Sequence, residues 1–476
     1  MYNQLFSIHP IGAMAQSVLH PYGDPIPRFK LKQGTELFTD HAGLALVGLA
    51  LAKFARVCET LDKAIPKRSG LSVGEIVTAY VGLLCTGKSD FDAIENHRQD
   101  GFFLEALSLS AVPAASTLRM QLDAQAERLL PLTDELSVAL LKNAGAPITP
   151  LACGLVPVDI DVFTQDNGRT RKEGVSRTYA GTDGFAPIAV YIGQEGWCVG
   201  LELREGSHFS SRETEYTLER SLPRAQTLTA AGLLVRWDSG FHSAQLSHQI
   251  EAASIARQAA GGEPIHFLVK GNPRRMDIAA LHAQRLETMA CQPREGKRLW
   301  IWESQESCLH QGQSLSHRRI HRLIERTLDV KTGQNLLVPE LEYDFWDTTL
   351  PARFRPIEVI DLYQDHGTHE QFHSEFKTDL DLERLPSGKF ATNDLVLSLA
   401  GLAYNMLRLM GQSALLSEDA PVRHTAKRRR LKTVMQELIY VSAKLVAHAR
   451  QKFLNFGRHC PAFVVFERLY GQWSTA

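Results

Sequence analysis

Leu155-Val156-Pro157-Val158-Asp159-Ile160-Asp161-Val162 is the stretch that decides the fold, because it is an apolar segment of strand length that carries two acids. Side chains alternate between the faces of a strand, so Asp159 and Asp161, two positions apart, share one face. A carboxylate in an apolar strand is costly unless it has a partner or a ligand. We therefore predict that Asp161 is presented to a functional site, with a hydrogen-bonded strand-end aspartate as the alternative. Whether Asp159 assists Asp161 stays open.

A second apolar segment, residues 233–237, also has strand length and ends directly before Asp238-Ser239-Gly240. An acid at the carboxyl end of a buried strand, followed by a glycine that lets the backbone approach a ligand, is typical of functional sites in α/β folds. We predict such a role for Asp238. A residue that caps the next helix is the alternative interpretation.

The segments around these two strands follow one another in the order of an α/β core. Alternating or β-branched runs predict strands, and apolar residues spaced by three and four predict helices. In chain order we expect strands at 155–162, 186–192 and 198–203, a helix at 212–230, a strand at 233–237, a helix at 243–258 and a strand at 265–269. This is the order of a ribonuclease H-like core, so the expected fold class is α/β.

The composition of the chain changes at three further points. Residues from 271 to about 355 carry short strand candidates and turns with Gly or Pro, and helical patterns return from Ile357. We expect a helical N-terminal domain at 1–150, a catalytic core made of 151–270 and 356–420, a β-rich insertion domain at 271–355 and a basic C-terminal helical region at 421–476.

The N-terminal region shows helical spacing from Leu44 to Cys58, and Pro113 to Arg119 has the form of a turn and a Ser or Thr N-cap before a helix that runs to Leu130. A short helix pair of this kind could be a helix-turn-helix that binds the ends of a DNA element in the major groove. A plain helical bundle explains the pattern equally well, and both interpretations stay open.

Composition and charge limit the class of protein. The 476 residues carry a net charge of -1, but residues 421–476 hold eleven Lys and Arg against two Glu, a local net of +9.

The seven cysteines include no Cys-x-x-Cys pair, which argues against a zinc or disulfide framework and favours a reducing cytoplasm. The longest apolar run, Ala42 to Ala52, is too short for a membrane span of about 20 residues. We expect a cytoplasmic protein that does not enter the membrane.

A third acid, Glu370, lies in the segment from Tyr363 to Lys377. Glu370 and Lys377 are seven residues apart, so both lie on one face if the segment is helical, whereas the rival Glu375 points away from that face. A solvated surface pair is the alternative. Two-metal phosphoryl transfer needs carboxylates from different elements, and Mg²⁺ prefers oxygen ligands. We predict that Asp161, Asp238 and Glu370 hold Mg²⁺, with Mn²⁺ as a substitute.

Three histidines, His366, His369 and His373, stand at helical spacing in the same segment. This spacing suggests zinc, but no Cys or further His cluster supplies a fourth ligand. We favour contact with a DNA backbone or packing for these side chains.

The segment Tyr363-x2-His366-x3-Glu370-x6-Lys377 resembles the Tyr-Arg-Glu-Lys signature of bacterial insertion-sequence DDE transposases, with His366 in place of the usual Arg. A histidine is shorter than arginine and largely neutral at pH 7, which weakens the expected grip on phosphate at that position. Other segments resemble the thirteen-eighty insertion-sequence family: 161–167, 172–179, 203–206, 235–240, 382–390 and 403–405.

The resemblance implies a transposase that cuts and joins double-stranded DNA at terminal inverted repeats by a cut-and-paste route, then inserts the element into target DNA. Whether a hairpin forms at the excised end stays open. It also implies catalysis by Asp161, Asp238 and Glu370, a homodimer on DNA, and a bacterial, nucleoid-associated location. The phosphates at the element's end would be bound by Tyr363, His366 and Lys377. Trp346 in the insertion is the candidate for stacking on a flipped base, with a core tryptophan as the alternative.

The basic run Lys427-Arg428-Arg429-Arg430 is the candidate contact with flanking DNA, because it is the centre of the positive C-terminal region. Runs of this kind are also common on solvated surfaces.

Three other functions compete with transposition. A domesticated or inactive copy would bind inverted repeats without cutting, but all three acids are present. A ribonuclease H-like nuclease without strand transfer, such as a junction resolvase, would not need Tyr363 and Lys377. A sugar hydrolase with paired carboxylates explains neither the third acid nor the basic region.

Overall fold

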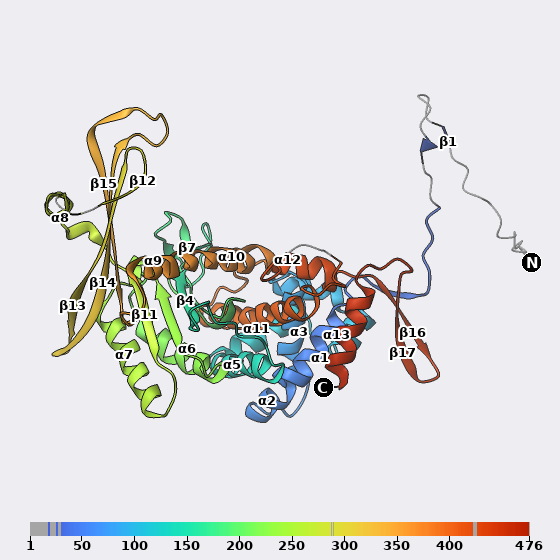
Figure 1. The fold of residues 1–476 in the computed structure, drawn as a ribbon. Coiled ribbons are helices and arrows are strands. Elements are labelled where there is room, and N and C mark those ends of the chain that lie inside the picture. The colour runs from blue at the N-terminus through green and yellow to red at the C-terminus, as the bar shows by residue number, and fades with distance from the viewer. Residues whose placement is uncertain are drawn as a thin grey trace, which may run out of the picture.

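The computed structural model describes residues 18–19, 25–26, 30–286, 288, 290–421 and 426–475. Its main feature is a nine-stranded sheet in the order β12-β13-β14-β15-β11-β10-β4-β8-β9. Helices pack beside the β4–β9 half, and the β12–β15 half projects as an arm at one end of an elongated body (Figure 1). The mixed α/β architecture expected from the sequence is confirmed.

The central strands bring the two aspartates to one edge. β4 (Val156–Val162) and β11 (Ile265–Lys270) both pair in parallel with β10 (Leu233–Trp237). All five residues of β10 are buried, as expected for a central parallel strand covered on both faces. Since parallel strands end at the same edge, Asp161 near the end of β4 and Asp238 directly after β10 lie on one side of the sheet.

The remaining core elements occupy the predicted positions. β8 (Ile188–Ile192) pairs antiparallel with β4, and β9 (Trp197–Glu202) pairs antiparallel with β8. Helix α6 (Thr214–Leu228) connects β9 to β10, and α7 (Ala244–Ala259) connects β10 to β11. The strand–helix order deduced from the sequence is therefore present in the structure.

Residues 271–355, expected to be β-rich, contain α8 (Ile278–Arg285) and four strands: β12 (Cys291–Arg294), β13 (Lys297–His310), β14 (Gln313–Leu328) and β15 (Asn335–Thr348). The base of β15 pairs antiparallel with β11, through Leu268 opposite Thr348. The arm is thus a continuation of the central sheet.

The N-terminal helices share the hydrophobic core of the sheet. They are α1 (Leu44–Ala50), the π-helix η1 (Leu51–Ala55), α2 (Val57–Ala64), α3 (Val73–Cys85), the 3-10 helix η2 (Phe91–His97), α4 (Gly101–Ala106) and α5 (Ala115–Asn143). One core cluster includes Leu83 of α3, Leu122 of α5 and Val158 of β4. The helices between residues 44 and 143 therefore share one core with the sheet.

Helix α5 differs from the prediction at both ends. Its N-cap is Ala114, which makes no side-chain cap bond, and the helix continues past Leu130 and through Pro131 to Asn143. Packing against the long buried helix α11 (Phe390–Ala414) and against α3 outweighs the hydrogen bond lost at Pro131. One face of α5 packs in this way, while Arg119, Met120 and Arg128 on the other face are exposed, so the bundle and the DNA-binding interpretations both stay open.

The C-terminal region is only partly helical, so the helical expectation for 421–476 was wrong in its middle. It consists of α12 (Leu431–Val434), the π-helix η7 (Met435–Ile439), the hairpin β16 (Ala443–His448) and β17 (Gln451–Phe456), and α13 (Phe463–Thr475). β16 also pairs with β3 (Leu37–Thr39). The hairpin turn places Ala449 and Arg450 at positive φ, a role in which the usual signal is Asn-Gly.

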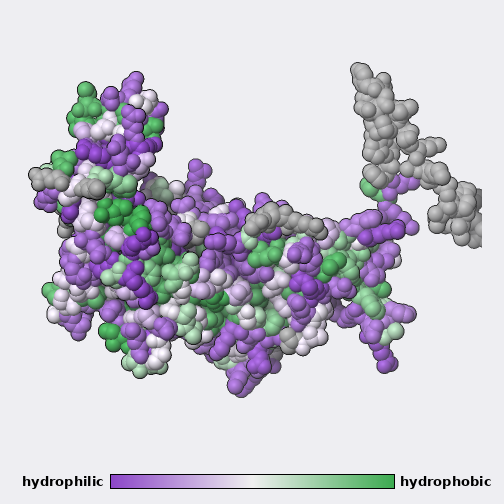
Figure 2. All heavy atoms as spheres, in the orientation of Figure 1, coloured by the Kyte–Doolittle hydropathy of each residue, from purple (hydrophilic) through white to green (hydrophobic). Residues whose placement is uncertain are grey.

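No helix in the described part of the chain is long and apolar enough to cross a membrane. Hydrophilic side chains cover much of the face seen in Figure 2, and apolar ones are scattered between them.

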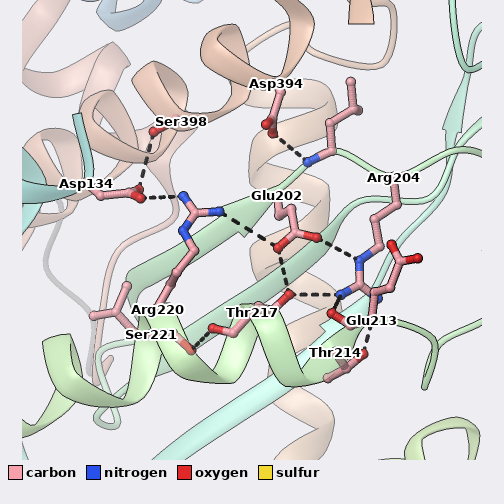
Figure 3. Close-up of polar contacts among 12 residues, drawn as sticks. Asp134, Glu202, Arg204, Glu213, Thr214, Thr217, Arg220, Ser221, Asp394 and Ser398 are labelled. Carbon is pink, nitrogen blue, oxygen red and sulfur yellow. Dashed lines mark hydrogen bonds and ion pairs between the residues drawn. The ribbon is translucent and has the colours of Figure 1, made fainter. Parts of the chain in front are cut away.

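A buried polar network joins β9 to the helices behind it (Figure 3). Glu202 at the end of β9 accepts a hydrogen bond from Arg204 at 3.2 Å and from Thr217 of α6 at 2.7 Å. Arg220 of α6 pairs with Asp134 of α5. Asp394 of α11 accepts a hydrogen bond from the Leu203 amide at 2.8 Å. The network fixes β9 and α6 against α5 and α11.

Asp394 predicts a stability change with pH. Burial raises the pKa of Asp394 from its ordinary 3.8 to about 7, and the Leu203 hydrogen bond only partly opposes this rise. Between pH 3.8 and 7 the unfolded chain loses this proton while the folded chain keeps it, so folding stability falls as pH rises through that window. Asp394→Asn keeps the oxygen that accepts the Leu203 hydrogen bond, and it removes the loss of folding stability at high pH because an amide does not titrate.

We expect Asp394→Asn to match the parent near pH 4 and to exceed its unfolding free energy at pH 8 by as much as about 4 kcal/mol. Urea denaturation at both pH values measures this difference. The exposed acid Asp365, changed to Asn, is the control for replacing an acid outside the core. A stabilisation by Asp394→Asn that is equal at both pH values would contradict the explanation.

Candidate active-site cleft

A cleft of about 450 Å³ opens at the edge where β4 and β10 end. The three predicted carboxylates and Tyr363 all line it, although they come from β4, from the turn after β10 and from the segment 356–374. Its lining residues are Asp161, Val162, Tyr179, Ser210, Asp238, Tyr363, Gln364, Gly367 and Glu370.

Asp161 is held in the cleft by its own strand and by a neighbouring histidine. Its Oδ1 accepts a hydrogen bond from the Val162 amide at 2.8 Å. Its Oδ2 lies 3.8 Å from Nδ1 of His373, whose ring stacks on Phe163 at 4.7 Å between centroids. His373 thus packs beside the carboxylate, in agreement with the packing alternative considered for the histidines.

Asp159 has a different role from Asp161. Both of its carboxylate oxygens accept hydrogen bonds from Arg236 of β10, at 2.7 and 2.8 Å, and the pair is buried. Arg236 also donates to the carbonyl of Leu362 at 2.6 Å. One guanidinium therefore ties together the strand of Asp161, the strand that precedes Asp238 and the helix that carries Tyr363.

Asp238 begins a tight turn. Its Oδ1 accepts a hydrogen bond from the Gly240 amide at 2.9 Å and caps the 3-10 helix η3 (Ser239–Phe241), not α7. A Cβ on Gly240 would lie only 2.9 Å from Oγ of Ser210 and 3.1 Å from Asp238 Oδ1, so the position suits glycine. The capping interpretation and the cleft position of Asp238 both hold.

The turn after Asp238 is tied to the base of the arm by Asp347 of β15. Nε2 of His242 lies 2.8 Å from Asp347 Oδ2, and Arg319 of β14 donates to both oxygens at 2.7 and 2.9 Å. Burial alone would raise the pKa of Asp347, but hydrogen bonds from His242, His317 and Arg319 outweigh it and hold this pKa well below its usual range.

Glu370 and Tyr363 lie on a segment of short helices that crosses the end of β4 (Figure 1). The segment comprises α9 (Pro356–Gln364), the 3-10 helix η5 (Asp365–Thr368) and α10 (His369–Ser374). Burial and the carboxylates of Asp238 and Asp161 raise the pKa of Tyr363, so its hydroxyl keeps its proton. The side chains of His366 and His369 lie outside the described residues.

Lys377 does not line the cleft. The helix becomes the π-helix η6 (Glu375–Asp379) after α10, and this wider turn alters the face on which Lys377 was expected. Its Nζ lies 3.1 Å from Glu383. Glu375 is fully buried, pairs with Arg408 and accepts the Leu431 amide at 3.0 Å, so it is a structural residue that points away from the cleft.

Trp346 is 1% exposed and belongs to a second core cluster at the base of the arm. Its ring lies 5.9 Å from that of Tyr363, and Arg322 covers it at 5.2 Å. A base cannot stack on a ring enclosed in this way, so the geometry supports the core alternative.

The basic run is largely bonded within the protein. Arg428 donates to Gln371 at 2.7 Å, Arg429 is buried and donates to the Leu415 carbonyl at 3.0 Å, and Arg430 pairs with Asp379 at 2.9 Å. Lys427 is exposed and donates to Gln194 at 3.1 Å. The run attaches the C-terminal region to α10 and η6, which leaves Lys427 the most accessible of the four cations.

Sequence reasoning did not identify several residues of the cleft region. Gln364 and Gly367 lie inside the signature segment and could have been included from their position. Tyr179 and Ser210 reach the cleft from separate loops, and Arg236 and Asp347 act through partners distant in the chain, so no local pattern marks them.

The carboxylates suit divalent ions in their chemistry. Three acidic side chains on one cleft offer the oxygen ligands that Mg²⁺ prefers. Among the described residues, no group of three His, Cys, Asp or Glu side chains stands close enough together to hold a metal ion. The acids thus share a cleft without forming a closed coordination shell.

Comparison with known proteins identifies a family and a similar solved structure. The family described as transposase DDE domain group 1 matches residues 32–474. A cryo-EM structure of the piggyBac transposase synaptic complex with hairpin DNA is similar with a TM-score of 0.41 and 10% identity, over 91% of this chain and 82% of that chain. No curated protein matches the sequence.

Proposed function

The chain belongs to the transposase DDE domain group 1 family, and we propose that it cuts and joins DNA in the cleft lined by Asp161, Asp238 and Glu370. One observation carries the proposal: three acids separated widely in the sequence line a single cleft together with Tyr363. Such convergence from different elements is what two-metal phosphoryl transfer requires.

Asp161, Asp238 and Glu370 would hold two divalent ions, Mg²⁺ or Mn²⁺. When bound, the ions would activate the attacking oxygen and stabilise the leaving oxygen. The protein fixes two of the acids through the backbone amides of Val162 and Gly240. Glu370 is exposed on a short helix and could adjust its position as the site fills.

Tyr363 would orient the scissile phosphate. Its hydroxyl keeps its proton because burial and two nearby carboxylates raise its pKa, so it can donate a hydrogen bond to a phosphate oxygen. Lys377 and His366 remain proposed phosphate contacts, with Lys377 reaching DNA only by leaving Glu383. Lys427 is the proposed contact of the basic run with flanking DNA.

The finer description follows the family resemblance. We propose a ribonuclease H-like core, a bacterial insertion sequence as the element, and cut-and-paste transposition at terminal inverted repeats. Two element ends must be held together for this reaction, so we propose two copies of the chain on DNA.

A cleavage assay tests the proposal. A linear DNA that carries the ends of its own element is incubated with the protein in Mg²⁺, in Ca²⁺ and in EDTA. We expect cuts at the element boundary that leave 3′-hydroxyl ends and products joined to a target plasmid, in Mg²⁺ alone. Specific end binding without cleavage in every metal tried, including Mn²⁺, would reject the enzyme and favour a binding protein.

Tyr363→Phe should slow cleavage without unfolding the protein. Losing one hydrogen bond to a charged group costs about 1.5–3 kcal/mol, which corresponds to a rate about 10- to 100-fold lower. Single-turnover cleavage measures the effect. Tyr216→Phe, which removes an exposed hydroxyl outside the cleft, is the matched control. Equal rates for Tyr363→Phe and the parent would remove Tyr363 from the phosphate site.

A further inference from the structure

The base of the arm makes a direct side-chain contact with the turn that carries Asp238. His242 directly follows η3, four residues after Asp238, and its Nε2 lies 2.8 Å from Oδ2 of Asp347. These two residues are 105 positions apart in the chain. The contact joins the turn that begins with a proposed metal ligand to a strand of the projecting arm.

Asp347 is itself firmly placed. It stands opposite Val269 of β11 on one side and opposite Arg319 of β14 on the other, so it lies where the arm joins the central sheet. Arg319 binds both of its oxygens, and Nε2 of His317 lies 3.4 Å from Oδ2. The side chain is almost fully buried. The Asp347 side chain is therefore held in place by these contacts, and the more exposed His242 binds to it.

Within this turn, Oδ1 of Asp238 accepts a hydrogen bond from the amide of Gly240 at 2.9 Å. Phe241 is buried and fixes the middle of the turn. His242 fixes its far end through Asp347. The turn that begins with Asp238 is thus held at its far end by a residue of the arm.

We propose that Asp347 is a positioning residue for Asp238 and acts through His242, so that the base of the arm sets the geometry of the cleft. This inference rests on the proposed function, because it takes Asp238 as a metal ligand. Residues that orient a ligand of a metal without touching the metal commonly change metal affinity by about 10- to 100-fold.

His242→Leu is the primary variant, because it breaks the link while Arg319 and His317 still satisfy Asp347. Asp347→Asn is the second variant. Asp344→Asn is the matched control, because Asp344 lies on the same strand and is similarly buried, but forms its ion pairs with Lys270 and Arg322 and not with His242. Melting temperatures show whether each variant is folded.

Two measurements are made on the full chain. Hydrogen–deuterium exchange of residues 239–242 should become faster in His242→Leu and Asp347→Asn, and stay as in the parent in Asp344→Asn. Titration with Mn²⁺ alone, followed by electron paramagnetic resonance, should show affinity about 10- to 100-fold weaker in the first two variants. Combining His242→Leu with Asp238→Asn should weaken Mn²⁺ binding no further than Asp238→Asn does by itself, because the two act in series.

Each outcome decides the inference. Unchanged exchange in His242→Leu, or Mn²⁺ losses that add in the double variant, would overturn it. Equal losses in Asp344→Asn would also overturn it, since they would show a general effect of the arm. Failure of the proposed function gives a different result: Asp238→Asn itself would then bind Mn²⁺ like the parent.

Discussion

Changing any one of Asp161, Asp238 or Glu370 to its amide is expected to lower the rate of DNA cleavage and of strand transfer by about 10³-fold or more. Metal ions in such sites supply several kcal/mol of transition-state stabilisation, and each 1.4 kcal/mol corresponds to tenfold in rate. An amide keeps the shape of the side chain but loses the charge that would hold the proposed ions. Specific binding to element ends should persist, because the cleft is only part of the DNA surface.

Single-turnover cleavage and gel-shift binding, measured on the same preparations, separate these two effects. Asp365→Asn is the matched control, since Asp365 is an exposed acid five residues before Glu370 that lines a different pocket. It should cut at the parent rate. Cleavage that survives in one of the three amide variants would remove that residue from the metal site and leave the other two to be paired with a new ligand.

Replacing Arg236 with Met is expected to reduce the free energy of unfolding by about 3–5 kcal/mol, the range found when one partner of a buried ion pair is removed. Both side chains of the Arg236–Asp159 pair are nearly inaccessible, so Asp159 would be left charged and without its two hydrogen bonds. The variant also loses the bond to Leu362, so α9 and Tyr363 should shift and cleavage should fall even where the protein is folded.

A double variant distinguishes these contributions. Adding Asp159→Leu to Arg236→Met removes the carboxylate that Arg236→Met deprives of its two hydrogen bonds, so much of the lost unfolding free energy should return. Cleavage should stay low, because neither apolar side chain can replace the bond to the Leu362 carbonyl. Urea denaturation and cleavage rates test both parts. If the double variant is as unstable as Arg236→Met, the loss comes from packing, not from the unpaired charge of Asp159.

The sequence was most informative where function and fold depend on a local pattern. The apolar runs of β4 and β10 marked both strands, and an acid inside or directly after such a run marked the cleft edge. The Tyr363–Glu370 spacing marked the third side of the same cleft. Each of these signals is contained within fewer than ten residues, which is why no knowledge of the tertiary structure was needed.

The features that were missed depend on partners far away in the chain. Asp159 and Asp161 look equivalent in the sequence, and only the position of Arg236 on the adjacent strand separates their roles. The π-helix at 375–379 moves Lys377 away from the face that an ideal helix would give it. The hairpin turn at Ala449 and Arg450 lacks the glycine or asparagine from which a turn is usually predicted.

The accessible positive charge of a segment also depends on partners from distant parts of the chain. The run from Lys427 to Arg430 has the composition of a DNA contact, yet Arg429 is buried and Arg430 is paired with Asp379. Composition reports how many cations a segment carries, but the acids and carbonyls that neutralise them come from other segments. The distribution of accessible charge therefore follows from the fold and not from a count along the chain.

Because the arm extends the central sheet without a break, its register is fixed from the body outward. β13 and β14 are paired residue for residue from Lys297 opposite Arg326 to His310 opposite Gln313, and the end of β13 lies beside α7, where Nε2 of His248 is 3.2 Å from the carbonyl of Cys308. A slip of β14 by one residue against β15 would turn its side chains to the opposite face of the sheet. Arg319, which stands opposite Asp347, would then lose the face on which it binds that carboxylate.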